Sequence, residues 1–203
     1  MPTADGRAKP QQGRSQQTYE RLLDVAGELV AEQGFESIST NLICARAGFA
    51  PSALYRYFKD KYGVLEALGE RLMVRQNEAL EAWVARHQPG GLDHMRSHIG
   101  ELLHDTAVAT NSVPGAVWIL RALHASPRMV SIRLESHRYV TDRLTEAYAS
   151  YLPGVDREEL WRRLRLSVEV GFAIDEMLQE EDRVSPEAVM RQTAQMLRAS
   201  AIE

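Results

Sequence analysis

The sequence predicts an all-α protein of about nine helices, in which a short-helix N-terminal module continues through a long fourth helix into a larger helical body. Three observations lead to this prediction. Apolar residues recur at three- and four-residue spacing along most of the chain. Helix-starting pairs such as Ser126-Pro127 alternate with helix-ending glycines such as Gly34 and Gly48. No stretch shows the strict alternation of a half-buried strand.

Capping residues divide the N-terminal module into short helices. The pattern predicts helices at about residues 15–33, 40–47, from 51 onward and 61–86. Ser39 or Thr40 caps the second helix. Pro51 suits the first turn of the third, because its missing N–H would have no partner there. Asp60 caps the long fourth helix, which Pro89-Gly90-Gly91 ends.

The larger body has five further helix signals. They predict helices at about residues 93–109, 112–124, 126–151, 156–180 and 185–199. Asp156, with Glu159 three residues later, forms a capping box for the fourth of these. We therefore expect a disordered arm, a small module and a body, at residues 1–14, 15–65 and 66–203. No flexible linker separates the last two.

Composition excludes several classes of protein. The 203 residues include one cysteine, Cys44, so neither an internal disulfide nor a thiolate zinc site is expected, which suits a cytoplasmic setting. No run of about 18 uncharged apolar residues predicts a membrane span. The N-terminal residues lack the apolar run of a secretory signal. No pattern indicates a cofactor or an enzyme's nucleophile.

Residues 39–58 have the pattern of a helix-turn-helix, which is two short helices joined by a glycine turn. In such motifs the N-terminal residues of the second helix reach base edges in the major groove of DNA. Small residues occupy those positions here: Ala50, Pro51, Ser52 and Ala53. Asn41 and Arg46, on the first helix, are candidates for a further base or phosphate contact.

A second set of residues suits the DNA backbone. Tyr55 and Tyr57 offer hydroxyls to phosphate oxygens, and Lys61 adds a charge beside the positive N-terminal end of the fourth helix. Ser39 and Thr40 could hold another phosphate. Each of these residues alone could equally be an ordinary surface side chain. Their combined spacing favours duplex DNA as a partner.

The same region resembles a known family. "AEQGFES" at 31–37 and "STNLICARAGFAPSALYRYFKDKYGVLEAL" at 39–68 look like the DNA-binding region of TetR-family transcriptional regulators, with the resemblance covering about residues 15–68. Cys44 stands where the family has alanine, and Tyr62-Gly63 replaces its usual acidic pair. The resemblance implies a homodimeric repressor that leaves a palindromic operator when a small molecule binds. Activation instead of repression stays open.

The resemblance also implies that the body binds the small molecule. Arg121, His124 and Glu169 lie on helices that look buried, where a buried Arg–Glu pair is the alternative explanation. Mixed aromatic residues suggest a hydrophobic or aromatic effector. The full set of candidates is Trp83, Ile99, Leu103, Trp118, Arg121, His124, Tyr139, Glu169 and Phe172.

Dimerisation is the other implied role of the body. The helix predicted at 156–180 is apolar on more than one side, so it must bury two faces. A four-helix bundle between two subunits would use such a surface, whereas a central helix in a monomer is the alternative. The candidate interface residues are Leu160, Leu164, Val168, Gly171, Ile174, Leu178, Val189 and Met196.

Two rival functions remain at this stage. His94 and His98 share a helix face near Glu101 and Asp105, which suits a helical metal-binding protein or enzyme. That helix offers no third histidine on the same face, so no metal site is predicted. The other rival is a helical adaptor that binds protein instead of DNA.

Overall fold

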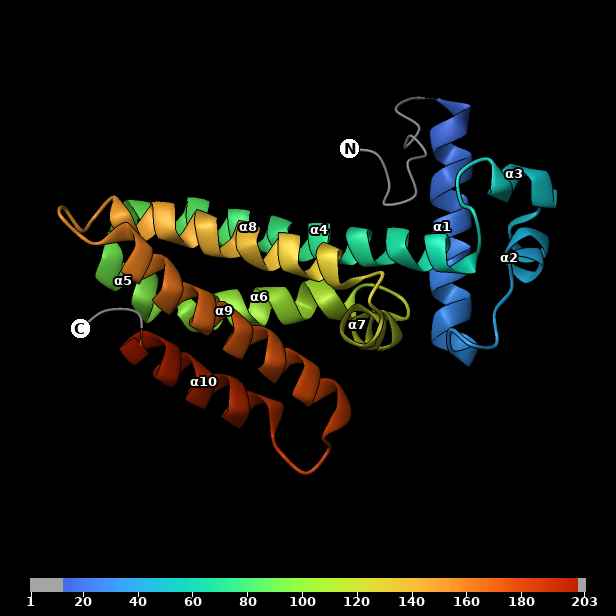
Figure 1. The fold of residues 1–203 in the computed structure, drawn as a ribbon. Coiled ribbons are helices and arrows are strands. Elements are labelled where there is room, and N and C mark those ends of the chain that lie inside the picture. The colour runs from blue at the N-terminus through green and yellow to red at the C-terminus, as the bar shows by residue number, and fades with distance from the viewer. Residues whose placement is uncertain (1–12, 201–203) are drawn as a thin grey trace. The chain divides into compact units, whose positions relative to one another are not determined.

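The computed structural model describes residues 13–200, which form ten α-helices and one short 3-10 helix (Figure 1). The described residues contain no β-strand, which confirms the all-α prediction. None of their helices combines the length and the apolar character needed to span a membrane. The helices are α1 (Arg14–Gln33), α2 (Thr40–Ala47), α3 (Pro51–Tyr55), α4 (Lys61–His87), η1 (Gln88–Gly90), α5 (Leu92–Ser97), α6 (Ile99–Asn111), α7 (Ala116–Ala125), α8 (Val130–Ala149), α9 (Arg157–Glu180) and α10 (Pro186–Ser200).

The helices group into two compact units. Unit 1 contains the described residues up to Leu72 together with Asn111–Ile132, and unit 2 contains Met73–Thr110 and the described residues from Arg133 onward. The first part of α4 belongs to unit 1 and the rest to unit 2. The functional division at residue 65 stays a prediction. Nearly all of the arm predicted at residues 1–14 lies outside the described residues.

Unit 1 is built around α1, whose Leu22, Val25 and Leu29 are fully buried. Glycines let α7 and the turn before it approach this helix closely. Gly115 has a left-handed backbone (φ 78°), and a Cβ there would lie 2.9 Å from Val30 Cγ1. A Cβ on Gly27 would lie 3.2 Å from the Pro114 carbonyl oxygen. The segment containing α7 therefore packs with the N-terminal helices.

Unit 2 has its own apolar core. Trp83 of α4 is fully buried, and its indole N–H donates to the His98 carbonyl at 3.0 Å. Leu144, Leu160 and Leu164 belong to the same cluster. Helices α9 and α10 run side by side in opposite directions (Figure 1). Asp156 caps α9 by accepting from the Glu158 and Glu159 amides, as the sequence predicts.

Three predicted helices differ from those observed. The helix predicted at 93–109 is two helices, α5 and α6, which break at His98. The His98 carbonyl accepts two hydrogen bonds, one from the Trp83 indole N–H and one from the Glu101 amide three residues later. The second bond closes a tight turn between α5 and α6. Helix α7 starts after the left-handed Gly115, and α8 starts at Val130. The expected starts at residues 112 and 126 are therefore wrong by several residues.

Candidate nucleic-acid interface and internal cavity

Helices α2 and α3 form a helix-turn-helix with the predicted capping. The Ser39 hydroxyl accepts from the Leu42 amide at 3.2 Å, which caps α2. Gly48 ends α2 in the left-handed conformation (φ 77°), with nothing within 4 Å of a Cβ placed there. Pro51 is the first residue of α3. Local chemistry therefore sets the turn between the two helices.

Apolar side chains attach this motif to α1. Ile43 and Leu54 are fully buried, and the Phe58 ring stacks on Tyr19 with ring centroids 5.2 Å apart. Cys44 is buried as predicted, and burial raises the pKa of its thiol. With these side chains inside, the opposite face of the motif is left to solvent. The exposed residues on it include Asn41, Ala50, Pro51 and Ser52, with Ala53 partly exposed.

Two hydroxyls meet at the edge of this face. Tyr55 is 47% exposed, and its hydroxyl lies 3.1 Å from the Thr40 hydroxyl. The Tyr55 hydroxyl comes from α3, and the Thr40 hydroxyl comes from the first turn of α2. Hydroxyl groups at a helix N-terminus suit an anion such as a phosphate. Contact of these two side chains with the DNA backbone stays a prediction.

Tyr57 and Lys61 lie differently from that expectation. Tyr57 is only 6% exposed, and its hydroxyl bonds to the hydroxyl and carbonyl of Ser15. The Lys61 ammonium donates to three backbone carbonyls between α1 and α2, at 3.2 to 3.5 Å. Both polar groups thus hold unit 1 together. Tyr57 is thus not an open, phosphate-facing side chain, and the partly exposed Lys61 would have to leave these carbonyls to reach a phosphate. Helix periodicity could not reveal these contacts, because they come from distant parts of unit 1.

Arg46 is exposed but paired. Its guanidinium makes two parallel hydrogen bonds to the Glu32 carboxylate of α1, at 3.0 and 3.1 Å. These bonds lower the pKa of Glu32. Any contact from Arg46 to a nucleic acid would have to compete with this pair.

The start of α4 is well defined despite the unusual Tyr62-Gly63 pair. The Gly63 amide donates to Asp60 Oδ1 at 2.9 Å, which confirms Asp60 as the cap. Arg128, from the turn before α8, donates to the buried Glu66 carboxylate at 2.7 Å. Burial opposes the charge of Asp60, but the Gly63 hydrogen bond and Arg128 outweigh it and lower the Asp60 pKa. Unit 1 therefore fixes the first two turns of α4.

Unit 2 contains a partly open cavity of about 80 Å³. Its walls come from α4, α5, α6, α8, α9 and α10, and most of the lining is apolar. Three candidate ligand residues line it, namely Ile99, Leu103 and Phe172. Gly171 also lines it, and a Cβ there would meet only Leu103, at 3.6 Å.

Two polar side chains of the cavity wall, Gln76 and Asp175, are joined through the Thr110 hydroxyl. Gln76 donates to the Thr110 hydroxyl at 2.8 Å, and that hydroxyl lies 2.9 Å from the Thr106 carbonyl and 3.3 Å from Asp175 Oδ2. A hydroxyl has only one proton to donate. The Thr110 hydroxyl therefore shares its proton between the Thr106 carbonyl and the Asp175 carboxylate, and burial outweighs the hydrogen bond from Thr110 and raises the pKa of Asp175. Gln76 Oε1 is buried without a hydrogen-bond partner among the described residues.

The other candidate ligand residues are not among those that line this cavity. Trp118, Arg121 and His124 belong to unit 1, where Arg121 and His124 are exposed. Trp83 is plain core, and the exposed Tyr139 donates to Glu81 at 2.6 Å.

Glu169 has its ion-pair partners within unit 2. It pairs with Arg133, Arg165 and His137. Burial opposes its charge, but hydrogen bonds from His137 and Arg165 hold the Glu169 pKa below its usual range. Helix periodicity could not show which side of each helix would line the cavity.

Much of the predicted dimer stripe is core. Leu160, Leu164 and Val168 are buried within the single chain, and Gly171 faces the cavity. Leu160, Leu164 and Val168 are therefore core residues of the single chain and do not form an exposed interface stripe, whereas Gly171 is partly exposed. Ile174, Leu178 and Val189 are partly exposed, and Met196 is 62% exposed. The apolar residues that α9 presents outward are Leu166, Ala173 and Met177.

The sequence reasoning missed Gln76, Thr110 and Asp175. One signal was present, because Asp175 is a carboxylate next to the apolar stripe of α9. It also missed His87, which lies beside His94 and His98 although it belongs to another helix. No spacing rule links residues on two helices.

Comparison with known proteins addresses the N-terminal part most directly. Residues 22–68 match the family of bacterial regulatory proteins described as the tetR family. The HTH-type transcriptional regulator UidR of Escherichia coli is 34% identical over 74 residues, which are 34% of this chain and 38% of UidR. An uncharacterized HTH-type regulator of Mycobacterium tuberculosis is 30% identical over 106 residues, which are 52% of this chain and 54% of that protein. The chain thus spans about two-fifths to half of these relatives.

Solved structures share the fold over most of the chain. A putative TetR-family regulator from Mesorhizobium loti has a TM-score of 0.71 at 13% identity, covering 93% of this chain and 96% of its own. The fatty acid degradation regulator FadR from Bacillus halodurans has a TM-score of 0.64 at 16% identity, covering 93% and 97%. At such identities the likeness concerns the fold alone.

Proposed function

We propose that the chain is a DNA-binding transcriptional regulator of the TetR family of bacterial regulatory proteins, whose family model residues 22–68 match. The observation that carries the proposal is the exposed face of α2 and α3. It combines small residues at the N-terminus of α3 with the paired hydroxyls of Thr40 and Tyr55. Small side chains allow a helix to approach base edges closely, and hydroxyls suit phosphates.

The two sets of residues have separate tasks in this proposal. Ser52 and its alanine and proline neighbours contact base edges in the major groove, including thymine methyl groups. Thr40 and Tyr55 contact phosphates and set the register of α3. Tyr57 and Lys61 act indirectly, because their bonds to Ser15 and to the α1–α2 loop hold the motif in shape.

We place two copies of the chain on a palindromic operator. The outward residues Leu166, Ala173 and Met177 of α9, with Met196 of α10, are apolar side chains that solvent would not favour in a lone subunit. A two-fold axis along these helices would bury them against the same face of a second copy. Leu166→Glu should then give a monomer, whereas Val108→Glu, on an exposed site of α6, should leave the dimer intact.

The cavity of unit 2 suits an apolar effector with one hydrogen-bond donor. The lining is mainly aliphatic, and Gln76 Oε1 offers an acceptor that the described residues do not use. Helix α4 contributes Gln76 and Leu80 to the cavity and Leu65 and Leu68 to unit 1. An effector that binds one position of α4 better than another would shift the regulator towards the form that releases DNA.

Selection of bound fragments from a random pool of duplex DNA tests the proposal. We expect enrichment of a palindromic sequence and release of the protein from it by a compound found in a screen. Gly171→Leu fills the cavity and should abolish release while DNA binding persists. Gly171→Ala, which makes only an ordinary contact with Leu103, should keep both. Failure to enrich any sequence would refute the regulator.

A further inference from the structure

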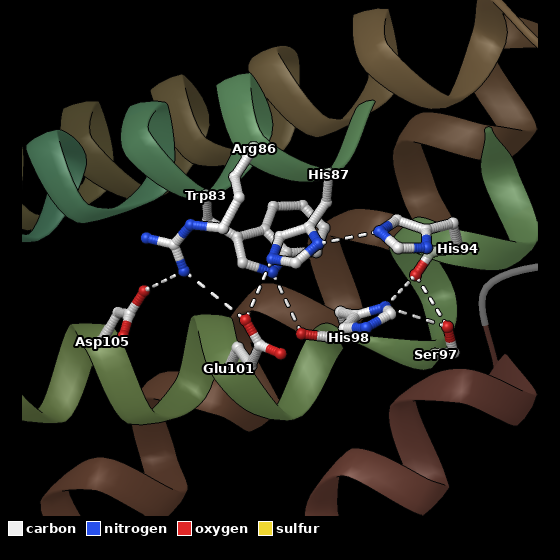
Figure 2. A network of polar contacts seen from close by, with 8 residues as sticks. All are labelled: Trp83, Arg86, His87, His94, Ser97, His98, Glu101 and Asp105. Atoms are coloured by element: carbon white, nitrogen blue, oxygen red, sulfur yellow. Dashed lines mark hydrogen bonds and ion pairs between the residues drawn. The ribbon is translucent and has the colours of Figure 1, made fainter. Parts of the chain in front are cut away.

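Three histidines from different parts of unit 2 converge at one point (Figure 2). His87 ends α4, His94 lies in α5, and His98 forms the break between α5 and α6. One ring nitrogen of each lies within 4.8 Å of those of the other two. His87 is buried, whereas His94 is exposed and can be reached from solvent. The fold therefore adds His87, from the end of α4, to the His94 and His98 pair that the sequence already suggests as candidate metal ligands.

Hydrogen bonds fix which nitrogen is available on two of the rings. His98 Nδ1 lies 2.7 Å from the His94 carbonyl, which can only accept, so Nδ1 carries the proton and Nε2 keeps its lone pair. His87 Nε2 lies 3.0 Å from the Glu101 carboxylate, so Nε2 carries the proton and Nδ1 keeps its lone pair. An acidic or carbonyl partner on the distal nitrogen is the usual support of a metal-binding histidine.

The third ring completes the arrangement. His94 Nε2 lies 3.2 Å from His87 Nδ1, so in the metal-free chain one proton must lie between two nitrogens. A metal ion can take the place of that proton once His94 moves its hydrogen to Nδ1. Tetrahedral ligation with bonds of 2.0–2.1 Å needs nitrogens about 3.3 Å apart. The His87–His94 pair already meets this, and the ligand nitrogens of all three histidines lie within 4.8 Å of one another, so metal binding would need them to move closer together.

Surrounding groups hold the cluster in place. The Arg86 guanidinium lies 3.5 Å from Glu101 and 3.4 Å from Asp105, so it orients the carboxylate that binds His87 (Figure 2). Gly90 lies directly beside His94, since a Cβ there would be 2.6 Å from the imidazole ring. The tight fit fixes the His94 ring and gives a way to displace it without removing a ligand.

We propose that His87, His94 and His98 bind a divalent transition metal, with Zn²⁺ as the best match and Glu101 as the orienting carboxylate. Three neutral imidazoles suit Zn²⁺, and the exposed side of His94 leaves a fourth position for water. The ion would join the end of α4 to α5 and the start of α6. The three histidines neither line the cavity nor belong to the α2–α3 face, so the metal site can be tested independently of the proposed function.

Calorimetric titration of the chelator-treated full chain with Zn²⁺ tests the site, and Co²⁺ absorption reports its geometry. We expect one Zn²⁺ per chain, the visible bands of tetrahedral Co²⁺, and a higher Tm with metal. His94→Ala and His98→Ala should remove all three effects. His104→Ala, a histidine on α6 outside the cluster, should remove none. Glu101→Ala should weaken affinity about 10- to 100-fold, as loss of such a partner does elsewhere.

His87 is buried, so its alanine variant could fail for lack of folding. Gly90→Ala provides the second test, because it leaves every ligand present but displaces the His94 ring. We expect its Zn²⁺ affinity to fall while its helix content stays that of the unaltered chain. Equal Zn²⁺ binding by the unaltered chain and by His94→Ala would overturn the proposal. So would loss of binding in His104→Ala.

Discussion

Gly115→Ala should destabilise unit 1 by more than any other left-handed glycine substitution in it. The new Cβ would lie 2.9 Å from Val30 Cγ1 and 3.1 Å from the Gly27 carbonyl oxygen, so α7 and α1 must separate. Gly48 is the matched control, since it has nearly the same φ and no atom within 4 Å. Both variants pay about 1–2 kcal/mol for a left-handed alanine. Overpacking adds about 1–3 kcal/mol for Gly115→Ala alone.

Hydrogen exchange followed by mass spectrometry measures this difference locally. In Gly115→Ala the buried amides of α1 and α7 should lose protection together, by about the overpacking term of 1–3 kcal/mol more than in Gly48→Ala. The reason is that residues 111–132 and the N-terminal helices form one packed unit. Equal protection in the two variants, or loss confined to α7, would refute this reasoning.

Three further changes test other parts of the structure. Tyr55→Phe removes the exposed hydroxyl and should weaken duplex binding about 10-fold on every sequence by fluorescence anisotropy; a change in sequence preference at constant affinity would contradict its assigned role. Asp175 has a raised pKa, so the folded chain keeps a proton that the unfolded chain has released, and stability falls as pH rises from about 4 through the folded-state value. Asp175→Asn should abolish that decline in thermal unfolding between pH 4 and 8, and an unchanged slope would count against a buried acid. Asp156→Ala removes the α9 cap and should cost about 1 kcal/mol in denaturant unfolding, whereas no loss would show that the cap is dispensable.

Local chemistry made most of the fold predictable. Ser39, Gly48, Pro51 and Asp60 act at short range, and each begins or ends a helix where the sequence analysis places it. The break at His98 could not be predicted in this way. At this break the His98 carbonyl accepts the indole N–H of Trp83, which comes from another helix.

The candidate sites were predictable only where one helix decides them. The exposed residues of α3 follow from the burial of Leu54 on its opposite side. Tyr57 and Lys61 were misplaced because their partners, Ser15 and the α1–α2 loop, lie more than 20 residues away. His87 was missed because it lies on a different helix from His94 and His98, so helical spacing does not relate it to them.

Helix α9 shows the limit of periodicity most clearly. Its apolar residues lie on more than one side of the helix, and the sequence pattern alone does not show which side packs into the core of the same chain. Leu164 turns inward, whereas Leu166 is 69% exposed. Residues of α4, α6 and α8 pack in one core cluster with Leu164, so this side of α9 is the buried one in unit 2.

The affinity of the full chain for its selected duplex, measured as a function of salt, tests the central claim most directly. Phosphate contacts release counterions, so the logarithm of the binding constant should fall linearly with the logarithm of salt concentration. The selected palindrome should bind two copies and bind more tightly than a scrambled duplex at every salt concentration. Binding that does not respond to salt, or that does not distinguish the palindrome from the scrambled duplex, would contradict the assignment of α2 and α3 as a DNA-reading surface.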